Sequence, residues 1–226
     1  MLSNVLNKIL SKNEVQPPAS KNPPVEVKKP NLNLAKCFTR IEKLKELGFE
    51  PEWIWDGGAL VGEWTRNVSK IYPNSNFVVV EPNDEVVSKM NENLSNMPKE
   101  NWNLVNAALG KEDKTAELNI WKNPNHSHEI VRLAASSLKS HTQGDATKVK
   151  KIDLKKIDSI AKENNFKCDL LKIDLQGAEL EALEGAEETL KNCEVIISEF
   201  GLLDAYIDRT TPNDLMAFLY ERGFIL

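Results

Sequence analysis

The sequence has few cysteines and no long hydrophobic run. Its 226 residues include three cysteines, Cys37, Cys168 and Cys193, which form neither an even disulfide set nor a CxxC pair. This usage is typical of a reducing compartment, so we expect a cytoplasmic protein with Cys168 and Cys193 in its core. No segment approaches the roughly 20 apolar residues that span a bilayer. None has the apolar core and cleavage site of a signal peptide.

An excess of positive charge is also absent. The formal net charge is -5, and charged residues make up 28% of the chain. Proteins that bind nucleic acids neutralise phosphates with basic surfaces, so we do not expect a nucleic-acid partner. Apolar residues make up 41%, including five Trp, seven Phe and three Tyr, which is enough for a core and argues against wholesale disorder.

The composition changes near residue 34. Residues 1–12 carry apolar side chains on one helical stripe, and residues 13–34 contain five prolines among Lys, Asn and Ser. We expect a short amphipathic helix followed by a flexible linker. The helix could pack on its own domain or contact a protein or membrane surface, and the sequence leaves this open, together with the oligomeric state. Residues 35–226 form the predicted folded domain, which we expect to be short at its C-terminus.

Helix and strand patterns alternate through residues 35–226. Helical patterns cover 35–47, 63–71, 83–95, 155–164, 178–191 and 212–222, and strand patterns cover 53–55, 77–80, 103–105, 115–121, 148–154, 169–174 and 194–200. Short apolar strands separated by helices are typical of a sheet that is covered on both faces. The predicted fold class is therefore α/β, with a doubly wound and mostly parallel sheet.

Acidic side chains follow several of the predicted strands. Asp56, Glu81, Asp174 and Glu199 each come where a buried strand ends. Ligands of open parallel sheets bind beyond the carboxyl ends of the strands. We therefore expect these carboxylates to lie at one ligand site.

The first of these strand ends is a glycine-rich turn that opens a helix. Gly57, Gly58 and Gly62 do not have the GxGxxG spacing of a dinucleotide site, and Asp56 precedes them. An acid at this place suits a cationic amine better than a phosphate. Glu81 ends the next strand, where a carboxylate can accept hydrogen bonds from both hydroxyls of a ribose. An amine contact, a glycine turn and a ribose contact favour S-adenosylmethionine over NAD.

These carboxylates have plainer interpretations as well. Asp56 and Glu81 could cap helices or form surface ion pairs. Asp174 could cap the helix that starts at Ala178, or it could contact a ligand. The sequence does not choose between these roles.

Five segments resemble the FkbM family of S-adenosylmethionine-dependent methyltransferases. They are KLKELGFEPEWIWDGGALVGEWT (43–65), VVVEPN (78–83), NAALG (106–110), LLKIDLQGAELEALEGA (170–186) and ISEF (197–200). The resemblance covers about 35–226, and its most specific part runs from Lys172 to Glu179.

The resemblance implies a Rossmann-like class I methyltransferase fold that transfers a methyl group to a hydroxyl of a sugar, glycan or secondary metabolite. It places Asp56, Gly57, Gly58 and Gly62 in the cofactor loop, Glu81 and Pro82 at the ribose, Asn106 and Ala107 at the adenine, and Asp174 at the methyl-transfer centre. Three residues depart from the family pattern. Leu60 stands where the family usually has Asn, Gly57 where Val or Ile is frequent, and Gln176 where Glu is commoner.

Methyl transfer from a sulfonium is an in-line displacement, in which the protein mainly positions the acceptor. A hydroxyl acceptor also loses a proton, and the candidates to take it are Asp174, Glu199 and Glu179, in that order. Two other functions stay open from the sequence. The domain could be a degenerate interaction module, or another Rossmann-type enzyme that uses a nucleotide.

A polar stretch at 122–147 contains all three histidines, His126, His128 and His141. It could bind a metal, cover the acceptor, or form a plain surface loop. No carboxylate or thiol completes an obvious ligand set there, so we expect no metal.

Overall fold

The computed structural model describes residues 32–121, 136–140, 142, 148–199 and 206–225. The helix predicted over 1–12 and the three histidines lie outside these residues. We describe the domain over Cys37–Leu226, which forms one compact unit.

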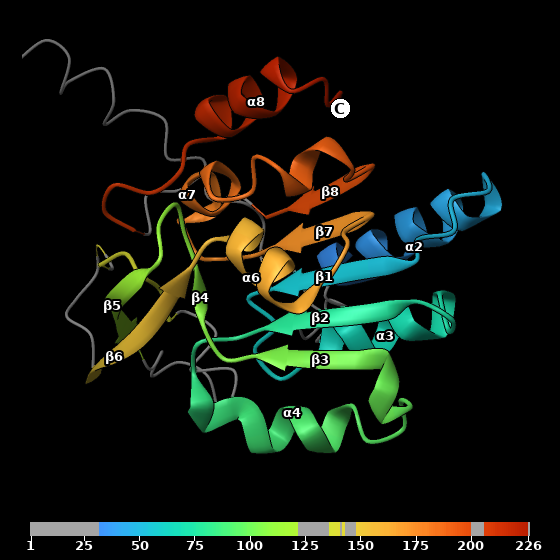
Figure 1. Ribbon diagram of the computed structural model, residues 1–226, viewed down its shortest axis with the longest axis horizontal. Coiled ribbons are helices and arrows are strands. Elements are labelled where there is room, and N and C mark those ends of the chain that lie inside the picture. The colour runs from blue at the N-terminus through green and yellow to red at the C-terminus, as the bar shows by residue number, and fades with distance from the viewer. Residues whose placement is uncertain (1–31, 122–135, 141, 143–147, 200–205, 226) are drawn as a thin grey trace, which may run out of the picture. The chain divides into compact units, whose positions relative to one another are not determined.

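The main sheet of the described chain has five parallel strands in the order β3-β2-β1-β7-β8. The strands are β1 (Trp53–Gly57), β2 (Asn76–Val80), β3 (Trp102–Val105), β7 (Leu170–Ile173) and β8 (Val195–Ser198). Figure 1 shows them side by side, all pointing to the same edge. The chain winds outward from β1 in both directions, so strand order reverses between β1 and β7. This confirms the predicted doubly wound sheet.

Helices cover both faces of this sheet because successive strand side chains point to opposite sides. They are α2 (Leu32–Glu46), α3 (Glu63–Ile71), α4 (Val87–Asn93), α6 (Ile157–Asn164), α7 (Glu179–Glu184) and α8 (Pro212–Glu221). Ile54 on β1 packs into a core with residues of α2, α3 and α4. Trp55, the next residue, packs into a second core with α6, α7 and α8. Cys168 and Cys193 belong to this second core, as predicted.

A second, smaller sheet lies beyond the carboxyl edge of the first (Figure 1). Its strands are β4 (Ala108–Leu109), β5 (Lys114–Ile120) and β6 (Lys148–Lys155), in the order β4-β6-β5. The predicted strands at 115–121 and 148–154 form its antiparallel pair β5 and β6. Strand β4 was not predicted, because its two residues are too few for a periodic pattern.

The helix predicted over 178–191 is wrong in its second half. Helix α7 ends at Glu184, and a separate short 3-10 helix covers Thr189–Lys191. The cause is Asp158 of α6, whose carboxylate accepts hydrogen bonds from the backbone N–H groups of Glu188 and Thr189 at 3.0 and 2.8 Å. A continuous helix would need those two donors for its own ladder.

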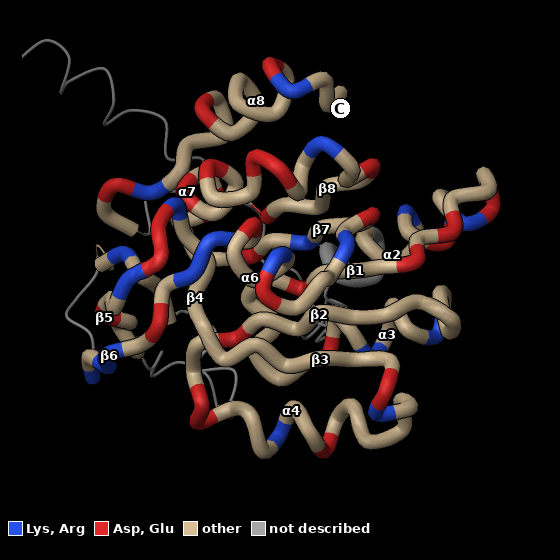
Figure 2. The backbone as a smooth tube through the Cα atoms, viewed as in Figure 1, with Lys and Arg blue, Asp and Glu red and all other residues tan. Residues whose placement is uncertain are grey.

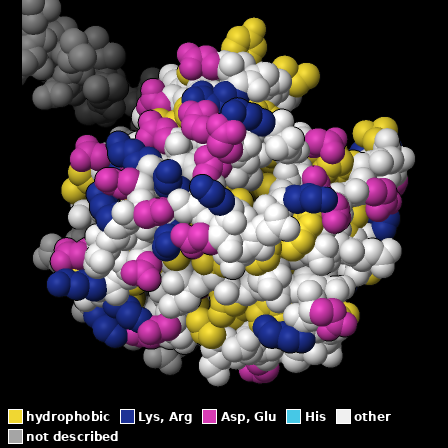
Figure 3. Space-filling model, viewed as in Figure 1, with side chains coloured by type: hydrophobic (Ala, Val, Ile, Leu, Met, Phe, Trp, Pro, Cys, Tyr) yellow, Lys and Arg dark blue, Asp and Glu magenta, His cyan; other side chains and the backbone are white. Residues whose placement is uncertain are grey.

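Charges of both signs are interspersed over the domain. Basic and acidic residues alternate along the backbone (Figure 2), and the face in Figure 3 shows them mixed with hydrophobic patches. Many form exposed ion pairs such as Lys43–Glu46 at 2.8 Å, which contribute little to stability. None of the described helices is long and apolar enough to cross a membrane.

Candidate functional site

The turn after β1 is built on residues in the left-handed region. Gly58 and Gly62 have φ of 73° and 69°, and Leu60 between them has φ of 50°. At Gly58 an added Cβ would overlap the backbone oxygen of Asp174, which follows β7. Only glycine lets the two strand-end turns come this close.

Leu60 carries backbone strain that a glycine or asparagine would not. A branched apolar residue at positive φ costs about 1–2 kcal/mol, whereas Asn tolerates this region because its side chain bonds locally. The family residue Asn therefore has a physical reason at this position. Leu60 instead packs its side chain against the core of the second sheet and lines the pocket.

The side chain of Leu109 packs against Gly57 and leaves no room for a side chain at position 57. A Cβ on Gly57 would lie 2.9 Å from the side chain of Leu109 at the end of β4. Leu109 is fully buried and takes the space that a Val or Ile at position 57 would fill. The departure from the family pattern is therefore compensated by packing.

A buried lysine holds the β1 turn. Lys172 on β7 forms an ion pair with Asp56 at 2.9 Å, and its ammonium donates to the carbonyls of Gly57 and Gly58 at 3.3 and 3.0 Å. Thr65 of α3 donates to the other oxygen of Asp56 at 2.6 Å. Burial lowers the pKa of Lys172, but the charges of Asp56 and Asp174 more than offset this and raise it on balance. Lys172 is therefore a cation at neutral pH.

This pair changes the interpretation of Asp56. Its side chain is completely buried and does not line the pocket, so it has no exposed oxygen for an amine. Sequence reasoning missed Lys172 as its partner. The signal available was a lysine inside an otherwise apolar strand, since buried lysines are rare unless paired.

Glu81 lies at the end of β2 with both carboxylate oxygens engaged by backbone. The N–H of Leu60 donates to one oxygen at 2.8 Å and the N–H of Asn83 donates to the other at 2.9 Å. Burial raises the pKa of Glu81 to about 7, although these two hydrogen bonds act in the opposite direction. Asn106 donates to the backbone oxygen of Glu81 at 2.8 Å.

One pocket of about 250 Å³ joins these strand ends to the second sheet. Six of the predicted site residues line it: Gly58, Glu81, Pro82, Ala107, Asp174 and Glu199. The other five, Asp56, Gly57, Gly62, Asn106 and Glu179, are not in its wall. The remaining wall is Leu60, Val80, Ala108, Leu109, Leu118, Ser136, Ser137, Leu138, Leu175, Gln176 and Ala178. The contribution of residues 136–138 was not predicted individually, since the contact with β5 that places them is long-range.

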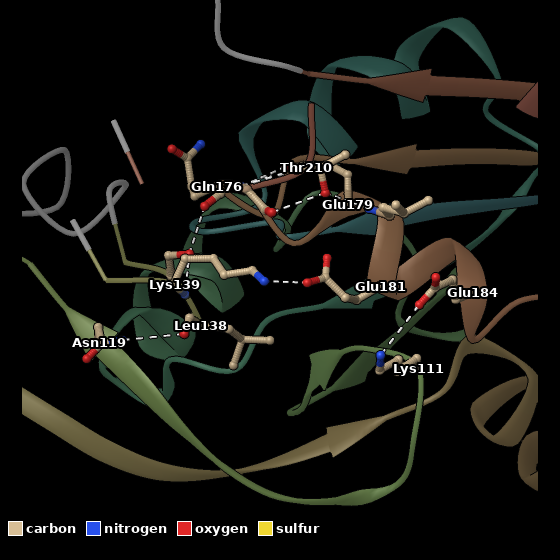
Figure 4. Close-up of polar contacts among 12 residues, drawn as sticks. Lys111, Asn119, Leu138, Lys139, Gln176, Glu179, Glu181, Glu184 and Thr210 are labelled. Carbon is tan, nitrogen blue, oxygen red and sulfur yellow. Dashed lines mark hydrogen bonds and ion pairs between the residues drawn. The ribbon is translucent and has the colours of Figure 1, made fainter. Parts of the chain in front are cut away.

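The second sheet is attached to the β7–α7 turn by polar contacts (Figure 4). Ser137 pairs with Asn119 of β5 through backbone bonds, and its hydroxyl donates to the backbone oxygen of Gln176 at 2.8 Å. Lys139 forms an ion pair with Glu181 of α7. These contacts hold the 136–139 segment over the pocket.

Glu179 is a structural partner of the same turn. Its carboxylate accepts from the backbone N–H groups of Leu175 and Gly177 at 2.9 and 3.1 Å. Burial raises the pKa of Glu179. Asp174 does not cap α7, because the helix N-terminus at Ala178 has no side-chain cap.

Asp174 and Glu199 form a carboxyl pair at the end of the pocket that lies next to residues 136–138. Both residues follow the paired ends of the neighbouring strands β7 and β8, and both line the pocket. The charge of Asp174, then burial, then a hydrogen bond with Asp174 raise the pKa of Glu199 to about 7. No group of three His, Cys, Asp or Glu in the described part of the chain is arranged to hold a metal.

The parallel sheet, its strand order and a pocket at its carboxyl edge define a Rossmann-like α/β domain. The family described as the methyltransferase FkbM domain matches residues 56–226. The chain therefore belongs to the FkbM methyltransferase family, which confirms the resemblance seen in the sequence.

Two further proteins are similar over parts of their length. Methyltransferase 1 of Beauveria bassiana is 24% identical over 149 residues, which cover 62% of this chain and 60% of that protein. The match thus spans less than two thirds of the relative. The crystal structure of precorrin-6y C5,15-methyltransferase from Geobacter metallireducens has a TM-score of 0.45 at 15% identity, over 82% of this chain and 70% of that one.

We predict that Lys172→Met lowers the free energy of unfolding by about 3–5 kcal/mol, because it leaves Asp56 as an uncompensated buried charge. Lys167→Met is the matched control, since it breaks the exposed pair Lys167–Glu52 and should leave the free energy of unfolding nearly unchanged. Urea unfolding of both variants measures the difference. Equal losses would contradict a buried pair.

We predict that Leu60→Asn is more stable than Leu60→Ala by about 1 kcal/mol. Both variants remove the apolar packing of Leu60, but only Asn relieves the left-handed backbone. Thermal and urea unfolding compare the two proteins. A less stable Asn variant would show that position 60 carries no strain.

Proposed function

We propose that this domain binds S-adenosylmethionine and transfers its methyl group to a hydroxyl of a sugar, glycan or other hydroxylated metabolite. The observation that carries the proposal is that Gly58, Glu81 and the Asp174–Glu199 pair line one pocket at the point where strand order reverses.

The wall near β2 fits an adenosine. Glu81 uses one lone pair of each oxygen for a backbone N–H, so an ionised carboxylate keeps acceptor capacity for ribose hydroxyls. Pro82, Ala107 and Ala108 supply an apolar surface beside it, against which a base can pack.

The charge of the pocket favours a cationic ligand. Glu81, Asp174 and Glu199 line it, and no Lys, Arg or His does so among the described residues. A pyrophosphate would meet carboxylates here without a compensating cation, which argues against a dinucleotide. A sulfonium with an amino-acid moiety carries positive charge where the carboxylates are.

The other end of the pocket suits a neutral acceptor. Asp174 and Glu199 accept hydrogen bonds from hydroxyls, and the buried hydroxyl oxygen of Ser136 has no hydrogen-bond partner among the described residues. A polyol satisfies such groups, whereas an anionic acceptor would be repelled. The bound cofactor supplies an activated methyl group. Asp174 orients the acceptor hydroxyl and takes its proton at a carboxylate oxygen.

We predict that S-adenosylhomocysteine binds about tenfold more weakly at pH 6 than at pH 8. Ribose hydroxyls donate to ionised Glu81, and a carboxyl with a pKa of about 7 is about one-tenth ionised at pH 6. Calorimetric titration at both pH values measures the change, and Glu81→Ala should abolish binding at both.

Glu81 and Glu199 both have a pKa of about 7, and the variant Glu199→Gln tells which of them controls the pH dependence of binding. It should keep the pH dependence of S-adenosylhomocysteine binding, because Glu199 does not contact the ribose in this proposal. A folded wild-type protein that does not bind S-adenosylhomocysteine would instead favour the interaction-module function.

We predict that Asp174→Asn lowers methyl transfer by about 10²–10⁴-fold while leaving S-adenosylhomocysteine affinity unchanged. The assay uses S-adenosylmethionine with a labelled methyl group and a panel of neutral, cationic and anionic hydroxylated compounds. Wild-type rates in the variant would remove Asp174 from proton transfer, and turnover of an anionic acceptor would contradict the charge argument.

A further inference from the structure

Gln176 links three parts of the site. Its amide nitrogen donates to Asp174 at 2.6 Å, and its amide oxygen accepts from the hydroxyl of Tyr206 at 2.9 Å. Its backbone oxygen accepts from the hydroxyl of Ser137 at 2.8 Å, as Figure 4 shows in part. Gln176 also has a left-handed backbone with φ of 54°.

The Gln176 amide has its nitrogen toward Asp174 and its oxygen toward Tyr206. An NH₂ group can only donate, so the Asp174 oxygen that faces it acts as an acceptor. The phenol of Tyr206 then donates to the amide oxygen. The result is a directional chain of hydrogen bonds from Tyr206 through Gln176 to Asp174, and on to Glu199.

We propose that Gln176 is a positioning residue that keeps Asp174 as the ionised member of the Asp174–Glu199 pair and leaves the shared proton on Glu199. The hydrogen bond from Gln176 to Asp174 is charge-assisted only when Asp174 is ionised. It does not stabilise a negative charge on Glu199. This inference rests on the proposed function for its catalytic meaning, because the ionised member is the group that accepts the acceptor proton.

The groups around Glu199 agree with this assignment. The charges of Asp174 and Glu179 raise the pKa of Glu199, and the charge of Lys172 lowers it. Burial raises the pKa of Tyr206, and the charge of Glu199 adds to this. Glu199 itself is solvent-exposed, so it can exchange the proton with water, whereas Asp174 is half-buried. Glu199 first releases its proton to water, and the proton that Asp174 takes from the acceptor can then move to the ionised Glu199.

An amide is better suited to this role than a carboxyl would be. A glutamate at 176 would place a third carboxyl beside Asp174 and Glu199, and it would need a proton of its own to donate. The amide donates at every pH. The amide of Gln176 therefore orients Asp174 without adding a further titratable group to the site.

Carbon-13 NMR of the full chain, with labelled Asp and Glu carboxyl groups, tests the proposal without an acceptor. Spectra between pH 5 and 9 are compared for wild type and Gln176→Met, which matches the side-chain length but has no amide. Asp174→Asn and Glu199→Gln assign the two signals. In the wild type, the Glu199 signal should titrate near pH 7 while the Asp174 signal stays constant over that range.

In Gln176→Met the preference of the proton for Glu199 should fall on the order of tenfold, so that the Asp174 signal also changes near pH 7. Tyr206→Phe should give a smaller change of the same kind, because it frees the amide to rotate. An Asp174 signal that is constant in both variants would overturn the proposal, and so would an Asp174 signal that titrates near pH 7 in wild type.

S-adenosylhomocysteine titration of the same samples keeps the two proposals apart. Gln176→Met should bind it within about threefold of wild type, since Gln176 does not contact the ribose wall; a collapse of binding would mean that Gln176 acts on the whole pocket. Loss of binding in the wild type would remove the proposed function, and the carboxyl titrations would still decide the role of Gln176.

Discussion

The buried ion pair of Lys172 and Asp56 is the interaction on which the pocket depends. It lies between the central strands β1 and β7, where strand order reverses, and it ties the β1 turn to β7 through two backbone carbonyls. A lone charge at this depth would be strongly destabilising, so each residue requires the other. The pair is neutral as a whole: the charge of Lys172 lowers the pKa of the pocket residue Glu81, and the charge of Asp56 raises it.

This arrangement explains how an acidic pocket can exist at the edge of a buried sheet. Glu81 is held by two backbone N–H groups, Asp174 by an amide and Glu199 by solvent exposure and a shared proton. Each carboxyl has a different means of tolerating its charge. The pocket surface stays negative while the structure beneath it is compensated, and the proposed function uses that combination for a cationic cofactor and a hydroxylated acceptor.

Much of the main sheet could be predicted, because its strands are continuous apolar runs and their ends are marked by acids. The convergence of Glu81, Asp174 and Glu199 followed from the rule for parallel strand ends. The direction of a side chain did not follow: Asp56 ends the same kind of strand but points into the sheet toward Lys172. The break of α7 at Gly185 depends on Asp158 from another helix, and the 136–138 wall depends on pairing with β5. Local patterns carry no information on such long-range contacts.

The close approach of Gly58 to Asp174 has a consequence for how the two ends of the pocket communicate. The β1 turn and the β7 turn touch through backbone atoms, with no side chain between them that could yield. A displacement of the first turn is therefore transmitted to the second as a rigid motion. If the proposed cofactor and acceptor bind at these two turns, one free energy of coupling links them, and each would alter the affinity of the other by the same factor.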